Sequence, residues 1–148
     1  MEIQKIKLQM VKENTTIYTL DKIKTPKDIV ELINAHEHYD LTPTEKIIVI
    51  GVDNKNQVNT YTEIATGTAG YTNFKMCDLF KPLLLSNSSK FIMVHNHPSG
   101  DTTPSKEDLN ITDKVEEASK LMGLEFLDHI IIGDDYTSIM TLRQKNNS

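Results

Sequence analysis

The sequence has only one cysteine, no tryptophan and no long apolar run. The lone Cys77 cannot form an intramolecular disulfide, and a zinc site made of four thiolates is excluded. The longest apolar stretches, at residues 47–52 and 130–132, are too short to cross a bilayer as helices. The N-terminal residues mix charged and apolar side chains and contain no apolar signal-peptide core. We therefore expect a cytoplasmic protein with no membrane partner.

Positive charge is also scarce. The 148 residues include 16 Lys and Arg against 21 Asp and Glu, so the formal net charge is −5. This balance argues against broad electrostatic attraction to the phosphate backbone of nucleic acids, although DNA stays open as a partner. Charged residues make up 25% and hydrophobic residues 38% of the chain, which is ordinary for a globular protein. The length is that of one compact domain.

The spacing of apolar residues divides the chain into three parts. Residues 1–24 form an N-terminal extension, in which alternation over 5–10 and the run 17–20 predict a strand or hairpin. Residues 25–142 form the main domain, and the polar residues 143–148 are expected to be a disordered tail. Helices are predicted at 26–37, 74–85 and 105–122, and the other strands at 46–52, 57–66, 91–94, 127–133 and 136–142. The fold class is therefore α/β or α+β, with one mixed sheet of about six strands and three helices.

The long predicted helix has a defined start and end. Ser105 is placed to cap its first turn, and Gly123 is placed to end it in a left-handed conformation. The apolar residues that we expect on its inward face are Leu109, Ile111, Val115, Ala118 and Leu121.

The segment from His95 to Asp108 carries the chemistry. Side chains two apart on a strand point the same way, so His95 and His97 project together from the end of a buried strand. Asp108 lies in the first turn of the following helix, three residues after Ser105. Two imidazoles and one carboxylate are the usual protein ligands of a catalytic zinc ion, with a fourth position left for water.

Each of these residues also has an ordinary structural explanation. A His-x-His pair by itself is more often solvated or hydrogen-bonded than bound to a metal. Asp108 by itself is the expected partner of Ser105 in a capping pair. The combination of a buried strand, a loop bounded by prolines and a capped helix favours the metal site.

Three stretches carry a resemblance to a known family: His95-Asn96-His97-Pro98, Pro104-Ser105 and Asp108. The pattern resembles the JAMM (MPN+) motif, and the surroundings at 67–68, 80–82 and 127–133 resemble the RadC-like branch of the JAMM/MPN+ (JAB) metalloproteases. The likeness extends from about residue 25 to residue 140. It implies a cytidine-deaminase-like fold of three α/β/α layers and a zinc-dependent centre of the isopeptidase type.

The resemblance also implies roles for individual residues. His95, His97 and Asp108 would be the zinc ligands, and Ser105 would help to hold the oxyanion or the zinc-bound water. Glu45, just before the strand at 46–52, would be the general base, with an exposed position at the strand start as its structural alternative. Glu63 is the second choice for the base, although it does not fall where the family motif places one. His129 is expected to be a hydrogen-bonded structural histidine rather than a ligand.

Three functions remain in competition at this point. The first is hydrolysis of an amide or isopeptide bond in a peptide or a linked protein by a zinc-activated water. The second is a role in DNA repair, on or with DNA, which is the label that RadC-like proteins commonly carry. The third is a non-catalytic module in which zinc only braces a loop. The sequence does not fix the substrate or the oligomeric state.

Overall fold

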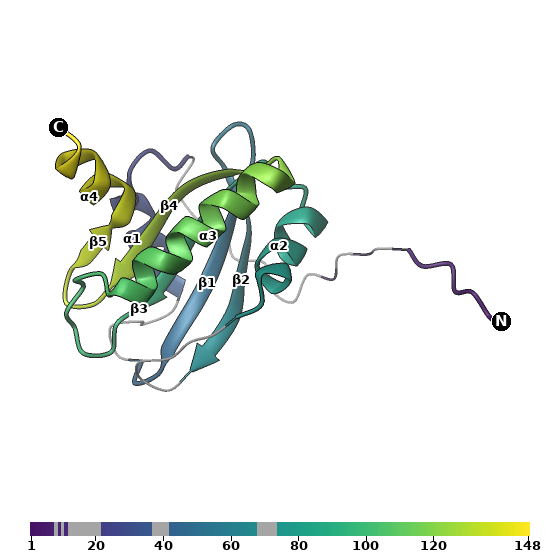
Figure 1. The fold of residues 1–148 in the computed structure, drawn as a ribbon, viewed down its shortest axis with the longest axis horizontal. Helices are drawn as coiled ribbons and strands as arrows, with labels where there is room; N and C mark the ends of the chain where they lie inside the picture. Colours follow the sequence, from purple (N-terminus) through teal and green to yellow (C-terminus); the bar gives the residue numbers. More distant parts are fainter. Residues whose placement is uncertain (8, 10, 12–21, 37–41, 68–73) are drawn as a thin grey trace.

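A single sheet with helices on both faces forms the body of the protein (Figure 1). The computed structural model describes residues 1–7, 9, 11, 22–36, 42–67 and 74–148. Within these ranges the elements are, in chain order, α1 (Pro26–His36), β1 (Glu45–Val52), β2 (Val58–Gly67), α2 (Met76–Leu85), β3 (Lys90–Asn96), α3 (Lys106–Met122), β4 (Glu125–Ile132), β5 (Tyr136–Ser138) and α4 (Ile139–Asn146). The α/β class with one mixed sheet is confirmed, with five strands and four helices instead of about six and three.

The strand order is β2-β1-β3-β4-β5. β1 is antiparallel to both β2 and β3, while β3 and β4 are parallel. The predicted β1–β2 hairpin turns at Asp53, whose side chain accepts hydrogen bonds from the backbone N–H groups of Lys55 and Gln57. A parallel pair needs a long crossover, and α3 supplies it between β3 and β4. The crossover helix therefore begins beside the end of β3, where the predicted histidines lie.

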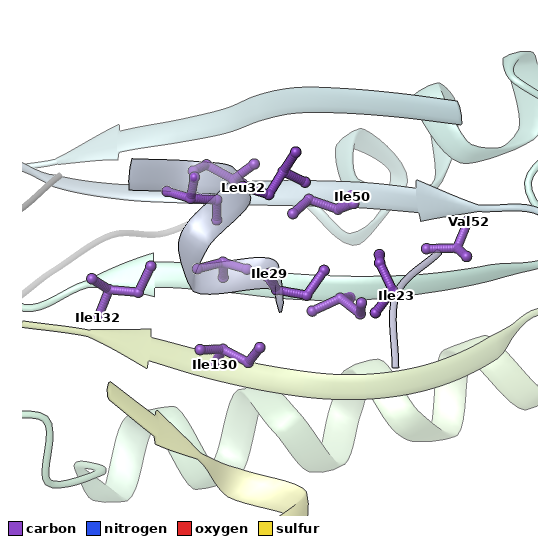
Figure 2. Packing of buried hydrophobic residues seen from close by; sticks show 11 residues of the cluster. Ile23, Ile29, Leu32, Ile50, Val52, Ile130 and Ile132 are labelled. Carbon is purple, nitrogen blue, oxygen red and sulfur yellow. The ribbon is translucent and has the colours of Figure 1, made fainter. Parts of the chain in front are cut away.

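Two hydrophobic cores lie on opposite faces of the sheet. Ile48 and Ile50 of β1 pack with Ile29 and Ile33 of α1, in the cluster that Figure 2 shows. Ile47 and Val49, together with β3 residues, α2 and Val115 of α3, form the second cluster. Adjacent β1 residues thus enter different cores, as the alternation of side chains along a strand requires. The result is a three-layer α/β/α arrangement.

Helix α3 has both predicted caps, but its inward face differs from the prediction. Ser105 and Asp108 form a reciprocal capping box, and Gly123 adopts the left-handed conformation with φ of 71°. Leu121 is 86% exposed and Leu109 is also exposed, so their assignment to the core was wrong. The buried positions are Asp108, Thr112, Val115 and Ser119. Polar side chains can occupy that face because hydrogen-bond partners meet them there.

The two ends of the chain also differ from prediction. Residues 5–7 and 9 are not in a strand, and Ile6 is 80% exposed, while residues 17–20 lie outside the described ranges. At the other end β5 stops at Ser138, which caps α4 by accepting a hydrogen bond from the Thr141 N–H. The expected strand to residue 142 and the disordered tail are therefore replaced by a helix that reaches Asn146. The domain boundary at residue 24 stays a prediction.

Candidate metal centre

Four side chains from three elements converge at one end of the sheet. His95 belongs to β3 and His97 follows it, Glu45 opens β1, and Asp108 lies in the first turn of α3. The two imidazole Nε2 atoms are 2.9 Å apart. Asp108 Oδ1 lies 3.1 Å from His95 Nε2, and Oδ2 lies 3.3 Å from His97 Nε2. Potential ligand atoms of Glu45, His95 and His97 all lie within 4.8 Å of one another. Four of the five residues that the sequence predicted for this site are therefore neighbours, and the fifth, Ser105, caps the helix that carries Asp108.

The pairing of β1 with β3 explains why Glu45 faces the histidines. The antiparallel register places Ile47 opposite His95. Counting two residues back from Ile47 and two residues forward from His95 continues this register to Glu45 and His97, and residues opposite each other share a face of the sheet. Glu45 Oε1 lies 3.9 Å from His95 Nε2, and the Glu45 side chain is only 14% exposed. The alternative of an exposed residue at the strand start is thus wrong.

The loop that follows β3 is fixed at several points. The His97 N–H donates to Ile132 O at 2.8 Å, which holds the end of β3 against β4. The His97 side chain contacts the Asp101 carbonyl oxygen through Nδ1 at 2.7 Å. Asp108 Oδ2 accepts from the Ser105 N–H at 2.6 Å, and Ser105 Oγ accepts from the Asp108 N–H at 3.1 Å. The capping box therefore aims the Asp108 carboxylate at the imidazoles; the predicted oxyanion role of Ser105 stays a prediction.

Electrostatics favour an ionised carboxylate at this site. Burial by itself would raise the pKa of Asp108, but hydrogen bonds with the His95 and His97 imidazoles outweigh it and hold that pKa well below its usual range. The hydrogen bond with Asp108 raises the pKa of His97, and burial only partly opposes this. His95 is 3% exposed, so the centre of the cluster is nearly dry. An ionised carboxylate beside two imidazoles in such a place attracts a cation.

A second layer of polar groups lies behind His95. The Nδ1 atom of His95 is 2.7 Å from Nε2 of His129, and Nδ1 of His129 is 2.6 Å from Oγ1 of Thr112. Burial lowers the pKa of His129 well below its usual value. His129 is thus the hydrogen-bonded histidine that the sequence predicted. Thr112 was missed, although its position four residues after Asp108 places it on the same face of α3.

Glu63 lies in a different group of residues. Its carboxylate contacts the Lys46 ammonium at 3.0 Å and the Thr66 hydroxyl. Burial would raise the pKa of Glu63, but these two hydrogen bonds lower it overall. Among the described residues, the cluster with metal-ligand spacing contains Glu45 and not Glu63. Glu45 therefore lies at the histidine cluster and Glu63 does not, and the role of Glu45 as the base stays a prediction.

The distances fit a small ion with nitrogen and oxygen ligands. Ligand atoms about 2.0–2.2 Å from one zinc ion stand roughly 3.3–3.6 Å apart in a tetrahedron. The contacts among His95, His97 and Asp108 lie at 2.9, 3.1 and 3.3 Å, which is at or a few tenths of an ångström below this spacing. Glu45, at 3.9 Å, stands slightly further out. The residues present therefore fit a metal held by two imidazoles and a carboxylate, with a second carboxylate beside it.

The family comparison agrees with this geometry. The model of the RadC-like JAB domain matches residues 23–146, which is most of the chain. The chain belongs to this family. Within the described part of this RadC-like JAB domain, no helix has the length and apolar character needed to cross a membrane.

Relatives of this RadC-like JAB domain occur in archaea and bacteria. A UPF0758 protein of Methanosarcina mazei is 41% identical over 113 residues, covering 76% of this chain and 48% of the relative. A UPF0758 protein of Clostridium perfringens is 36% identical over 125 residues, covering 84% of this chain and 53% of the relative. One from Clostridium botulinum is 40% identical over 124 residues, covering 84% and 52%. The chain thus spans about half the length of the curated relatives that it matches.

Gly133 of this RadC-like JAB domain offers a test of the loop that supports His97. A Cβ atom at Gly133 would collide with the Gly100 carbonyl oxygen and approach Thr102 Cγ2 to 2.9 Å. Gly133→Ala should therefore displace the loop that carries the Asp101 carbonyl, lowering the free energy of unfolding by about 1–3 kcal/mol and weakening Zn²⁺ binding. Chemical denaturation and zinc titration measure both effects.

Gly123→Ala is the matched control. A Cβ there meets no atom within 4 Å, and only its φ of +71° strains the backbone. We expect a loss of about 1 kcal/mol of stability and an unchanged zinc affinity. Equal zinc affinities in the two variants would contradict a role of the loop in holding His97.

Proposed function

We propose that this RadC-like JAB domain is a zinc-dependent hydrolase of amide or isopeptide bonds. The observation that carries the proposal is the convergence of His95, His97 and Asp108, with Glu45 Oε1 3.9 Å from His95 Nε2. Three closely spaced ligands and one carboxylate slightly further out are what a hydrolytic zinc centre requires: a site that leaves room for water, and a base within reach of it. The family membership supports this interpretation.

In this proposal the ligands are the two Nε2 atoms and the Asp108 carboxylate. A zinc ion held by these residues would lower the pKa of a water bound to it to about 7 and would polarise a carbonyl group. Glu45 accepts a proton at a carboxylate oxygen during the attack and delivers it to the departing amine. In this proposal the Ser105 hydroxyl, at the start of α3, donates a hydrogen bond to the negative charge that develops on the substrate oxygen. Ser105 can cap α3 at the same time, because its hydroxyl oxygen still accepts a hydrogen bond from the Asp108 N–H.

The proposed substrate is an extended peptide or a protein joined through a lysine side chain. An amine leaving group needs a proton, and the carboxylate of Glu45 is the group that can return one. The whole protein's partners and substrates are part of the proposal and are not given by the names of the relatives.

Metal removal tests the proposed function. Protein purified without chelator should contain about one zinc per chain and hydrolyse some members of a panel of lysine ε-amide peptides with fluorogenic acyl groups. Treatment with 1,10-phenanthroline should abolish this hydrolysis, and added Zn²⁺ should restore it, because the three ligands are preformed. Elemental analysis and fluorescence measure the two quantities. Hydrolysis that persists in protein shown to be free of metal would contradict the proposal.

The two other functions predict different results. A module that uses zinc only as a brace would bind the ion and lose stability on chelation, but would hydrolyse no substrate of the panel. A DNA-associated role predicts binding to DNA that weakens steeply with salt. The net charge of −5 argues against that role, so we do not propose it.

A further inference from the structure

A continuous line of hydrogen bonds leads from the backbone of α3 to His95. The Thr112 hydroxyl contacts the Asp108 carbonyl oxygen at 2.6 Å and His129 Nδ1 at 2.6 Å. His129 Nε2 contacts His95 Nδ1 at 2.7 Å. Thr112, His129 and His95 are all buried, at 3% exposure or less. In such a place each polar atom depends on these partners for its hydrogen bonds.

The Asp108 carbonyl fixes the direction of every hydrogen bond in this line. A carbonyl oxygen can only accept, so the single Thr112 proton points to it. Thr112 Oγ1 must then accept from His129, which places a proton on His129 Nδ1. In a neutral imidazole the other nitrogen is an acceptor, so His129 Nε2 accepts from a proton on His95 Nδ1. His95 therefore keeps a proton on Nδ1, and Nε2, which lies 3.1 Å from Asp108 Oδ1, is the nitrogen from which a metal ion can displace a proton.

The opposite direction is unfavourable for two reasons. A Thr112 hydroxyl that donated to His129 would turn its lone pairs toward the Asp108 carbonyl oxygen at 2.6 Å. It would also shift the protons to both Nε2 atoms, so that His95 would present an N–H group to the site. An N–H group cannot bind a metal ion.

The position of the proton on His97 is fixed by a single hydrogen bond to a backbone carbonyl. Its Nδ1 atom is 2.7 Å from the Asp101 carbonyl oxygen, which again only accepts. Nδ1 of His97 is therefore protonated as well. Two backbone carbonyls, one reached directly and one through Thr112 and His129, thus keep both Nδ1 atoms protonated and leave both Nε2 atoms facing Asp108.

We propose that Thr112 and His129 are positioning residues that hold His95 in the tautomer with its proton on Nδ1. The proposal rests on the proposed function, because its consequence is a metal site in which both histidines present Nε2, and not Nδ1, to the ion. Hydrogen-bond partners behind a metal-bound histidine typically change metal affinity by about 10- to 100-fold. Neither residue touches the metal or the substrate in this account.

Thr112→Val is the decisive variant, because valine has nearly the same shape and no hydroxyl. We expect Zn²⁺ affinity, measured by competition with a chelating dye, to fall by about 10- to 100-fold. In metal-free, ¹⁵N-labelled protein, long-range ¹H–¹⁵N spectra of the imidazoles should show protonated His95 Nδ1 in the wild type and a gain of the Nε2-protonated form in the variant. Thr112→Ser keeps the hydroxyl and should restore both quantities.

Ser119→Ala is the matched control. Ser119 is buried on the same face of α3, seven residues further along, and its hydroxyl donates to the Glu116 carbonyl at 2.8 Å. Its loss removes a comparable hydroxyl without touching an imidazole. We expect some loss of thermal stability, with the wild-type tautomer and the wild-type zinc affinity.

The outcomes separate this inference from the proposed function. Wild-type tautomer and affinity in Thr112→Val would overturn the inference even where zinc-dependent hydrolysis is found. A wild-type protein that binds no zinc would overturn the proposed function, while the tautomer in metal-free protein would still test the hydrogen-bond line. Should Thr112→Val fail to fold, Thr112→Ala removes the same hydroxyl, and the same two measurements decide.

Discussion

Asp108→Asn should lower the zinc affinity by more than about 100-fold and abolish hydrolysis, while the protein stays folded. The Asp108 carboxylate lies 3.1 Å from His95 Nε2 and 3.3 Å from His97 Nε2, so the amide would replace a charged ligand by a weak neutral one. A direct ligand should cost more than the 10- to 100-fold typical of residues behind the ligands. Asparagine can still accept a hydrogen bond from the Ser105 N–H, so the start of α3 should survive. Chelator competition, hydrolysis assays and circular dichroism measure the three properties.

Asp101→Asn provides a control of the same chemistry in the loop that precedes α3. The Asp101 side chain accepts from the Thr103 N–H and is exposed, and only its backbone carbonyl contacts His97. Loss of an exposed charge should change zinc affinity by about fivefold at most. Should both variants lose affinity equally, the loss would reflect the overall charge near the site, and the role of Asp108 as a ligand would be contradicted.

Glu45→Gln should keep the metal and lower the rate of hydrolysis by about 10²- to 10⁴-fold, which is the usual contribution of a positioned acid–base group. Glu45 stands 3.9 Å from His95 Nε2, further out than the Asp108 oxygens, and a glutamine side chain has nearly the same size. A glutamine cannot take up the proton, although it can occupy the same space. Zinc content by elemental analysis and the single-turnover rate measure the two effects in the same preparation.

Glu63→Gln is the control for Glu45→Gln, because Glu63, on β2, is the other carboxylate that was considered as the base. The Glu63 carboxylate is held by Lys46 and Thr66, so its loss should leave the hydrolysis rate within a few-fold of the wild type and cost about 1 kcal/mol of stability at most. A variant Glu45→Gln that loses its zinc as Asp108→Asn does would show that Glu45 is a ligand and not the base.

Local sequence patterns were enough to predict the elements that build the site. The apolar strand before His95, the turn at Asp53 and the Ser105–Asp108 capping pair each depend on residues close together in the chain. These signals express backbone preferences that hold in any fold. The position of Glu45 beside the histidines needed more: Glu45 comes to face His97 only through the pairing of β1 with β3, and the resemblance to the family supplied that information.

Other features depend on tertiary partners that no local pattern shows. Leu109 and Leu121 fit the apolar stripe of a helix, yet the sheet-facing positions of α3 include Thr112 and Ser119. Thr112 can be buried there because the ring of His129 arrives from β4. In the same way, the segment after Ser138 has the composition of a strand and tail, but Asp128 accepts a hydrogen bond from the Met140 N–H and helps to begin a helix. In both places a polar side chain of β4, His129 or Asp128, supplies the hydrogen bond that the local sequence pattern does not show.

The Asp108 carboxylate serves the start of α3 and the imidazole pair at the same time. One of its oxygens, Oδ2, receives the Ser105 N–H and also faces His97. A cation bound here would draw electron density from the Asp108 carboxylate and would weaken the hydrogen bond that Oδ2 accepts from the Ser105 N–H. Loss of the cation would restore that hydrogen bond. Binding of an ion at this centre would therefore change the stability of the first turn of α3, the crossover helix between β3 and β4, through this one oxygen atom.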